Sequence, residues 1–161
     1  EYHGTYPLPE AQLDRFFLRL SLGYPNLNDE VQILQMQRSS QHPLESLQSV
    51  LSTDDILKMQ EAVLQVHIEE KLLTYIANIV QATRKHPDLS YGASPRGSLA
   101  LLRAAQAVSF VRGSDFVTPD TIKSLVEPVL AHRVIAVTHL NQQTTIRTIL
   151  KEIVSSVAVP V

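Results

Sequence analysis

The sequence contains no cysteine among its 161 residues. Disulfide bonds, cysteine-ligated zinc and thiol catalysis are therefore excluded, and the composition fits a protein of the cytosol. Long apolar runs are missing too, because none reaches the roughly 18 residues that a transmembrane helix needs. We therefore expect a cytoplasmic protein with no membrane span.

An excess of charge of one sign is also missing, since the formal net charge is −2. Bulk electrostatics therefore does not favour nucleic acid as a partner. The six histidines show no metal-ligand spacing. In the stretch that begins at His67, Lys71 occupies the place of the second histidine of the zinc motif H-E-x-x-H. We expect no metal-binding residues.

The residues that are present predict a mainly α protein. Apolar residues make up 44% and charged residues 19%, which is typical of a globular domain. Amphipathic patterns with short connections predict a small helical bundle between about residues 45 and 140. The predicted helices are 53–65, 69–84, 94–112 and 118–132, with a short helix at 9–16, a modest one at 28–38 and a last one at 144–156.

Residues 17–22 predict a strand, because Leu18, Leu20 and Leu22 alternate with polar residues. A lone strand leaves unpaired backbone groups on both edges, so it needs a sheet that little else before residue 45 can supply. The chain also begins at Glu1 without a methionine. We therefore expect a fragment of a longer protein, divided into residues 1–40, 41–140 and 141–161.

The stretch from Gly92 to Gly97 predicts the start of a helix. Ser94 is a favourable N-cap, and Pro95 falls at the first helical position, where its missing N–H costs nothing. Arg96 then lies in the first turn, where the helix dipole disfavours a cation. Free backbone N–H groups together with an arginine form an anion site, and a phosphate is the obvious anion. The alternative is a solvated surface arginine.

Two catalytic motifs that resemble this stretch are excluded. The spacing of Gly92 and Gly97 matches a phosphate-binding P-loop, but Ser98 occupies the place of the essential lysine. The string also resembles the hydrolase motif G-x-S-x-G, with the second glycine one residue too late. Pro95 has no N–H for an oxyanion hole, so nucleophilic catalysis at Ser94 is rejected.

Several stretches closely resemble MoxR-family AAA+ ATPases, in the right order. The segment that follows sensor 1 in this family is similar to residues 4–16, GTYPLPEAQLDRF. The sensor 2 region is similar to residues 91–105, YGASPRGSLALLRAA. Residues 116–120, FVTPD, and 129–133, VLAHR, also fit. The resemblance extends from residue 4 to about residue 135.

The resemblance implies a role for each candidate residue. Arg15 matches the arginine finger, which reaches across a subunit boundary to the γ-phosphate of a neighbour's ATP. Arg96 matches sensor 2, with Ser94 and Pro95 beside it at the nucleotide, in its own subunit or in the neighbour. A cation within reach of phosphate oxygens stabilises the charge that spreads over them in the transition state.

The resemblance also implies which parts of the ATPase this chain contains and which partners the intact protein has. Residues 1–40 correspond to the end of the ATPase core, and residues 41–140 to the helical lid. The Walker A and Walker B motifs are absent, so we expect no ATP hydrolysis by this chain alone and no nucleotide bound to it. The intact protein is expected to use ATP and Mg²⁺ in a homo-oligomeric ring, usually a hexamer. Its clients are von Willebrand factor A domains or other proteins that it matures.

A different class of function remains open. The amphipathic helices and the near-neutral charge are also typical of a helical protein–protein interaction module with no nucleotide role. Capture of a specific partner, unaffected by ATP, favours that alternative. A helical DNA-binding module is a distant third, which salt-sensitive DNA affinity would revive.

Overall fold

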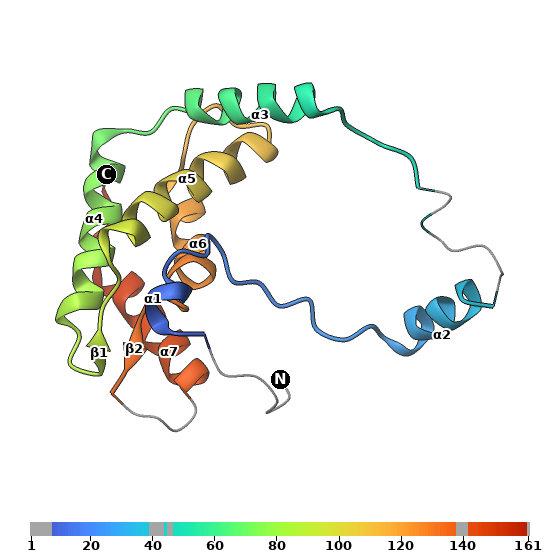
Figure 1. Cartoon of the computed structure of the whole chain (residues 1–161). Coiled ribbons are helices and arrows are strands. Elements are labelled where there is room, and N and C mark those ends of the chain that lie inside the picture. The colour runs from blue at the N-terminus through green and yellow to red at the C-terminus, as the bar shows by residue number, and fades with distance from the viewer. Residues whose placement is uncertain (1–7, 39–43, 45–46, 138–141, 161) are drawn as a thin grey trace. The chain divides into compact units, whose positions relative to one another are not determined.

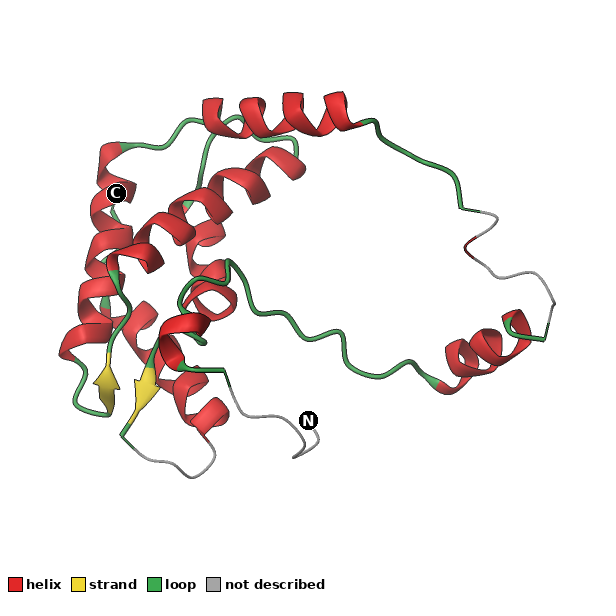
Figure 2. Ribbon diagram, in the orientation of Figure 1, coloured by secondary structure: helices red, strands yellow, loops and turns green. Residues whose placement is uncertain are grey.

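The computed structural model describes residues 8–38, 44, 47–137 and 142–160. These residues form helices joined by loops and one small sheet (Figure 2). The elements are α1 (Glu10–Leu13), α2 (Leu27–Met36), α3 (Thr53–Gln65), α4 (Glu70–Lys85), β1 (Leu89–Tyr91), α5 (Pro95–Val111), α6 (Pro119–Leu130), β2 (Ile135–Ala136) and α7 (Gln142–Ser156). The predicted class, mainly α with a small helical bundle, is confirmed.

The chain divides into two compact units. The main unit holds the described residues up to Arg19 and those from Glu61 onward, and the second unit is Leu20–Gln60. The division at residues 40 and 140 that we inferred from the sequence stays a prediction. None of the helices in the described residues is both long enough and apolar enough to cross a bilayer.

Four helices of the main unit form a closed bundle (Figure 1). Helix α4 packs against α5 and α7, and α6 packs against the same two helices. The predicted stripe of α4 is buried, and Tyr75 joins it, whereas Leu73 is exposed rather than widening the stripe. The small residues Ala104 and Ala105 on α5 are fully or almost fully buried, which lets the neighbouring helices approach closely.

The two strongest helix starts in the sequence form as predicted. Ser94 caps α5 and Thr118 caps α6, and each is followed by a proline in the first turn. The Thr118 hydroxyl accepts a hydrogen bond from the backbone N–H of Thr121 at 3.2 Å. Both helices therefore begin where local chemistry satisfies their free N–H groups.

A two-stranded antiparallel sheet pairs the segment before α5 with the segment after α6. Strand β1 pairs with β2, with Leu89 opposite Ala136 and Tyr91 opposite Ile135. The two strands lie side by side in Figure 1. Strand β1 ends at Tyr91, directly before Gly92. The pairing therefore fixes the position at which the loop that leads into α5 begins. Neither strand is predicted from the sequence.

The strand predicted at residues 17–22 does not form. This segment is irregular backbone in the structure, although its alternating pattern is present. Arg19 donates its backbone N–H to the carbonyl of Pro128 on α6 at 2.9 Å. Alternation alone does not make a strand, because a strand also needs a neighbour to receive its hydrogen bonds.

The second unit contains α2, which begins after an asparagine cap. The Asn26 side chain accepts a hydrogen bond from the backbone N–H of Asp29 at 3.0 Å. No residue of α2 is buried. Leu22 and Tyr24, which precede the helix, are also exposed. This unit therefore presents apolar side chains that it does not cover itself.

Candidate functional site

The loop before α5 is fixed to the end of α4. The buried Thr83 hydroxyl accepts a hydrogen bond from the backbone N–H of Ala93 at 2.9 Å, and Arg84 Nε donates to the Ala93 carbonyl at 2.8 Å. Gly92 lies so close to α4 that an added Cβ would come within 2.5 Å of the Arg84 backbone. A side chain at this position is therefore excluded, and the loop is held before the helix starts.

Ser94 and Pro95 build the first turn of α5, as the sequence predicts. The Ser94 hydroxyl accepts a hydrogen bond from the backbone N–H of Arg96 at 3.2 Å. Pro95 follows at the start of the helix and contributes no N–H. The Arg96 side chain projects from this turn with 66% of its surface exposed. It does not point into the apolar interior.

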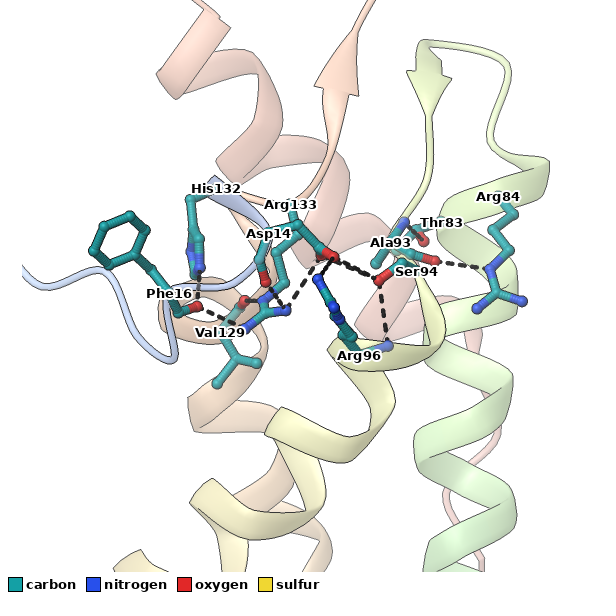
Figure 3. Close-up of polar contacts among 10 residues, drawn as sticks. All are labelled: Asp14, Phe16, Thr83, Arg84, Ala93, Ser94, Arg96, Val129, His132 and Arg133. Atoms are coloured by element: carbon teal, nitrogen blue, oxygen red, sulfur yellow. Dashed lines mark hydrogen bonds and ion pairs between the residues drawn. The ribbon is translucent and has the colours of Figure 1, made fainter. Parts of the chain in front are cut away.

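Asp14 connects this helix start to the turn after α1 (Figure 3). The Ser94 hydroxyl donates to both oxygens of the Asp14 carboxylate, at 3.1 and 3.0 Å. Arg96 Nη1 lies 3.9 Å from Asp14 Oδ2. The carboxylate thus supports the serine that caps α5 and lies at the far limit of an ion pair with Arg96.

Arg133, which follows α6, is the buried centre of the same network. Its side chain is 3% exposed. Nη1 lies 3.3 Å from Asp14 Oδ1 and also donates to the Asp14 backbone carbonyl, while Nη2 donates to the Phe16 carbonyl at 2.6 Å. Nε donates to the Val129 carbonyl at 2.9 Å. A buried guanidinium needs this many acceptors to offset its lost hydration.

Arg15 lies between the two carbonyls that Arg133 binds. Its own side chain is exposed, and Nη2 lies 3.5 Å from Gln12 Oε1. The structure thus brings Ser94, Pro95 and Arg96 together, and the residues on either side of Arg15 join the same network through their carbonyls. The Arg15 guanidinium remains directed to solvent rather than into the network.

His132 completes the contacts to the turn after α1. Its Nε2 lies 2.8 Å from the Phe16 carbonyl, so the ring donates its proton there (Figure 3). Burial lowers the pKa of His132, and the nearby cations Arg133 and Arg19 lower it further, although the Phe16 carbonyl and Asp14 oppose this. The lowered pKa favours the neutral ring, which donates through Nε2.

The exposed groups of this network have the chemistry of an anion site. Arg96 is a permanent cation at the positive end of a helix of 17 residues, and its nearest carboxylate is 3.9 Å away. A phosphate oxygen fits such a group better than a metal ion does. Within the part of the chain that the structure describes, no cluster of three or more His, Asp or Glu side chains could hold a metal.

The comparisons with known proteins point to one family. Residues 81–153 match the AAA lid domain. The chain is 35% identical to the Chaperone MoxR1 of Mycobacterium tuberculosis over 170 residues, which cover 99% of this chain and 44% of that protein. The crystal structure of a predicted ATPase from Cytophaga hutchinsonii superposes with a TM-score of 0.87 at 31% identity, over 100% of this chain and 52% of that one.

The chain belongs to the MoxR family of AAA+ ATPases. It is also 44% identical over 162 residues to the uncharacterized protein YeaC of Bacillus subtilis, covering 100% of this chain and 50% of that protein. The chain therefore spans about half the length of the curated relatives that it matches. The resemblance that the sequence motifs carry is confirmed.

Five contributors to this network were not identified from the sequence: Asp14, Thr83, Arg84, His132 and Arg133. Asp14 precedes a more conspicuous arginine, and Thr83 reads as part of an apolar stripe. Arg84 lies in the last turn of α4 beside Lys85, and Arg133 falls within the VLAHR motif. The signals available for Arg133 were its place directly after a predicted amphipathic helix and that motif.

Proposed function

We propose that this chain supplies the lid and two phosphate-directed arginines of a MoxR-type ATPase with chaperone-like activity. Arg96 senses the nucleotide that the intact protein binds, and Arg15 acts on the nucleotide of a neighbouring subunit. The single observation that carries the proposal is the Arg96 side chain, which is 66% exposed at a rigidly held helix start. The family membership of the chain supports it.

The lid structure explains how Arg96 can report on a phosphate. Thr83 and Arg84 fix the loop before it, and Ser94 caps the helix that carries it. A phosphate oxygen that attracts Arg96 therefore exerts its pull on α5 and, through α5, on the helices packed against it. A side chain on a flexible loop could not transmit that pull.

Arg15 has the exposure that an action across a subunit boundary requires. Its guanidinium is directed to solvent, while the backbone on both sides of it is bound by Arg133. Bound ATP with Mg²⁺ supplies the phosphoryl group that water attacks. Arg15 stabilises the charge that develops on that group, an effect worth about 10³–10⁵ in rate in other systems.

The assembly and the clients follow from the same proposal. A finger that acts in trans needs a homo-oligomeric ring, and the expected ring is a hexamer. The expected clients are von Willebrand factor A domains or other proteins whose maturation the motor assists. The expected location is the cytoplasm, and nucleic acid is not an expected partner.

The test is the substitution Arg96→Ala in the intact ATPase, with Arg112→Ala as the matched control. Arg112 is an exposed arginine directly after the other end of α5. We expect R96A to reduce ATP turnover, or its coupling to lid movement, by at least about tenfold, equivalent to about 1.4 kcal/mol of barrier. R112A should retain turnover. Normal coupled turnover in R96A rules out the sensor role.

A second candidate is a helical interaction module without a nucleotide role. The exposed apolar side chains of Leu20–Gln60 favour it, because such residues commonly mark contact surfaces. A purified client domain that binds with equal affinity with and without ATP supports this alternative. Binding that changes with the nucleotide supports the motor.

A further inference from the structure

Arg133 binds the backbone on both sides of Arg15. Its Nη1 donates to the carbonyl of Asp14 and its Nη2 to the carbonyl of Phe16, at 2.6 Å for the latter. His132 adds a contact to the Phe16 carbonyl at 2.8 Å. The carbonyls before and after Arg15 are therefore both held by one buried side chain (Figure 3).

The segment that carries Arg15 has little stability of its own. Helix α1 is four residues long, and the chain after Arg15 is irregular. A single helical turn does not persist in water without tertiary contacts. The position of the Arg15 backbone therefore depends on what anchors it. Arg133 and His132 hold the flanking carbonyls, Asp14 contacts Ser94, and four residues further on the Arg19 N–H binds the Pro128 carbonyl.

The anchor itself is rigid. Arg133 is 3% exposed, its Nε donates to Val129 at 2.9 Å, and its charge is balanced by Asp14. Its planar fork suits two acceptors that lie side by side, which a lysine ammonium cannot reproduce. Its aliphatic part lies beside Gly97, where an added Cβ would come within 3.8 Å of the Arg133 Cδ.

We propose that Arg133 is a positioning residue for Arg15: it fixes the backbone from which the finger reaches the neighbouring nucleotide. This inference rests on the proposed function of Arg15. Arg133 touches no nucleotide in this arrangement, because its donors are directed to Val129, Asp14 and Phe16. It acts on catalysis through the placement of Arg15 alone.

The first test is Arg133→Lys in the intact ATPase. Lysine keeps the charge beside Asp14 but cannot hold both carbonyls. A misplacement of a catalytic group by about 1 Å can cost 10²-fold, so we expect kcat to fall about 10–100-fold while the KM for ATP stays within about twofold. In the Arg15→Ala background, R133K should cause no further loss. A native kcat in R133K, or an additive loss, overturns the inference.

Mixed rings separate positioning from a general structural defect. R133K subunits keep their own nucleotide site, so they should regain turnover beside subunits that carry a native Arg15 but a disabled Walker A lysine. R15A subunits should be rescued in the same way. If R15A is rescued and R133K is not, the R133K defect lies within its own subunit. The inference about Arg133 then fails, while the proposed function of Arg15 stands. If R15A needs no rescue, the proposed function of Arg15 fails.

A second variant tests whether a loss of activity in R133K comes from misfolding. Arg133→Gln offers a planar amide donor without burying an ammonium group, and the same mixing experiment applies to it. Rescue of either variant supports the positioning role. If neither variant assembles into rings, Arg133 serves folding rather than positioning, and the inference is overturned.

Discussion

Ser94 donates its hydroxyl proton to Asp14, a residue 80 positions earlier, at 3.0 and 3.1 Å. The same hydroxyl accepts the backbone N–H of Arg96. One oxygen therefore caps α5 and ties it to the turn that carries Arg15. In a motor in which Arg96 and Arg15 act on different nucleotides, this contact joins the two groups within one subunit.

The first prediction concerns the coupling of Asp14 and Ser94. D14N removes a charged acceptor and should lower the free energy of unfolding by about 1–3 kcal/mol, and S94A should lower it by about 1 kcal/mol. Because the two groups share a hydrogen bond, the double mutant should lose about 0.5–2 kcal/mol less than the sum. Denaturant unfolding of the four proteins measures this coupling.

The matched control for this cycle is T118A. Thr118 caps α6 as Ser94 caps α5, although it accepts from the N–H three residues on rather than two, and its hydroxyl bonds to Thr121 rather than to Asp14. The pair D14N and T118A should therefore be additive within about 0.5 kcal/mol. Additivity for D14N and S94A as well would show that their hydrogen bond contributes nothing to stability.

The second prediction concerns the close approach of Gly92 to α4. In G92A the new Cβ would meet the Arg84 Cα and N at 2.5 Å, so the loop must move away. We expect a loss of about 1–3 kcal/mol and faster hydrogen exchange of the Ala93 N–H, which Thr83 now protects. The control is G113A, where nothing lies within 4 Å of the added Cβ but the φ of +74° strains an alanine. G113A should therefore lose stability without faster exchange of the Ala93 N–H. Unchanged exchange of Ala93 in G92A contradicts this account.

The third prediction concerns the pH dependence of stability through His132. Burial lowers the pKa of His132 below its ordinary value of 6.5, so the unfolded chain binds the proton more readily. The contribution of neutral His132 to the free energy of unfolding is therefore fully present above about pH 6.5, and it is lost as the pH falls through the folded-state pKa. Protonation would also place an N–H at Nδ1, which is buried without a hydrogen-bond partner in the described structure.

The measurement is the difference in unfolding free energy between the native chain and H132Q, taken from about pH 7.5 to about pH 5. The native chain should lose more stability than H132Q as the pH falls. H67Q controls for the removal of a histidine at an exposed position. Parallel pH profiles for the native chain and H132Q are the opposing result.

The sequence predicts those parts of the fold whose causes are local. The caps Ser94 and Thr118, with their prolines, depend on neighbouring atoms in the chain, and both helices begin there. The stripe of α4 depends on a single periodicity, and it is buried. Arg96 is likewise placed by its offset from a local cap.

The parts that the sequence does not predict depend on distant partners. Residues 17–22 have the alternation of a strand but no neighbouring strand among the described residues, whereas β1 and β2 are too short to produce a pattern and form because they meet. Asp14 and Arg133 become partners only once α1 and α6 lie together. Propensity and periodicity contain no information about such pairs.

The most direct test of the central claim is the turnover and nucleotide affinity of Arg15→Ala in the intact ATPase, beside Arg38→Ala. Arg38 is an exposed arginine of the second unit and serves as the control. If Arg15 acts only on the charge that develops in the transition state, kcat should fall about 10³-fold or more in R15A, and the Kd for ATP should stay within about twofold of native. A kcat for R15A that equals that of R38A would contradict the account.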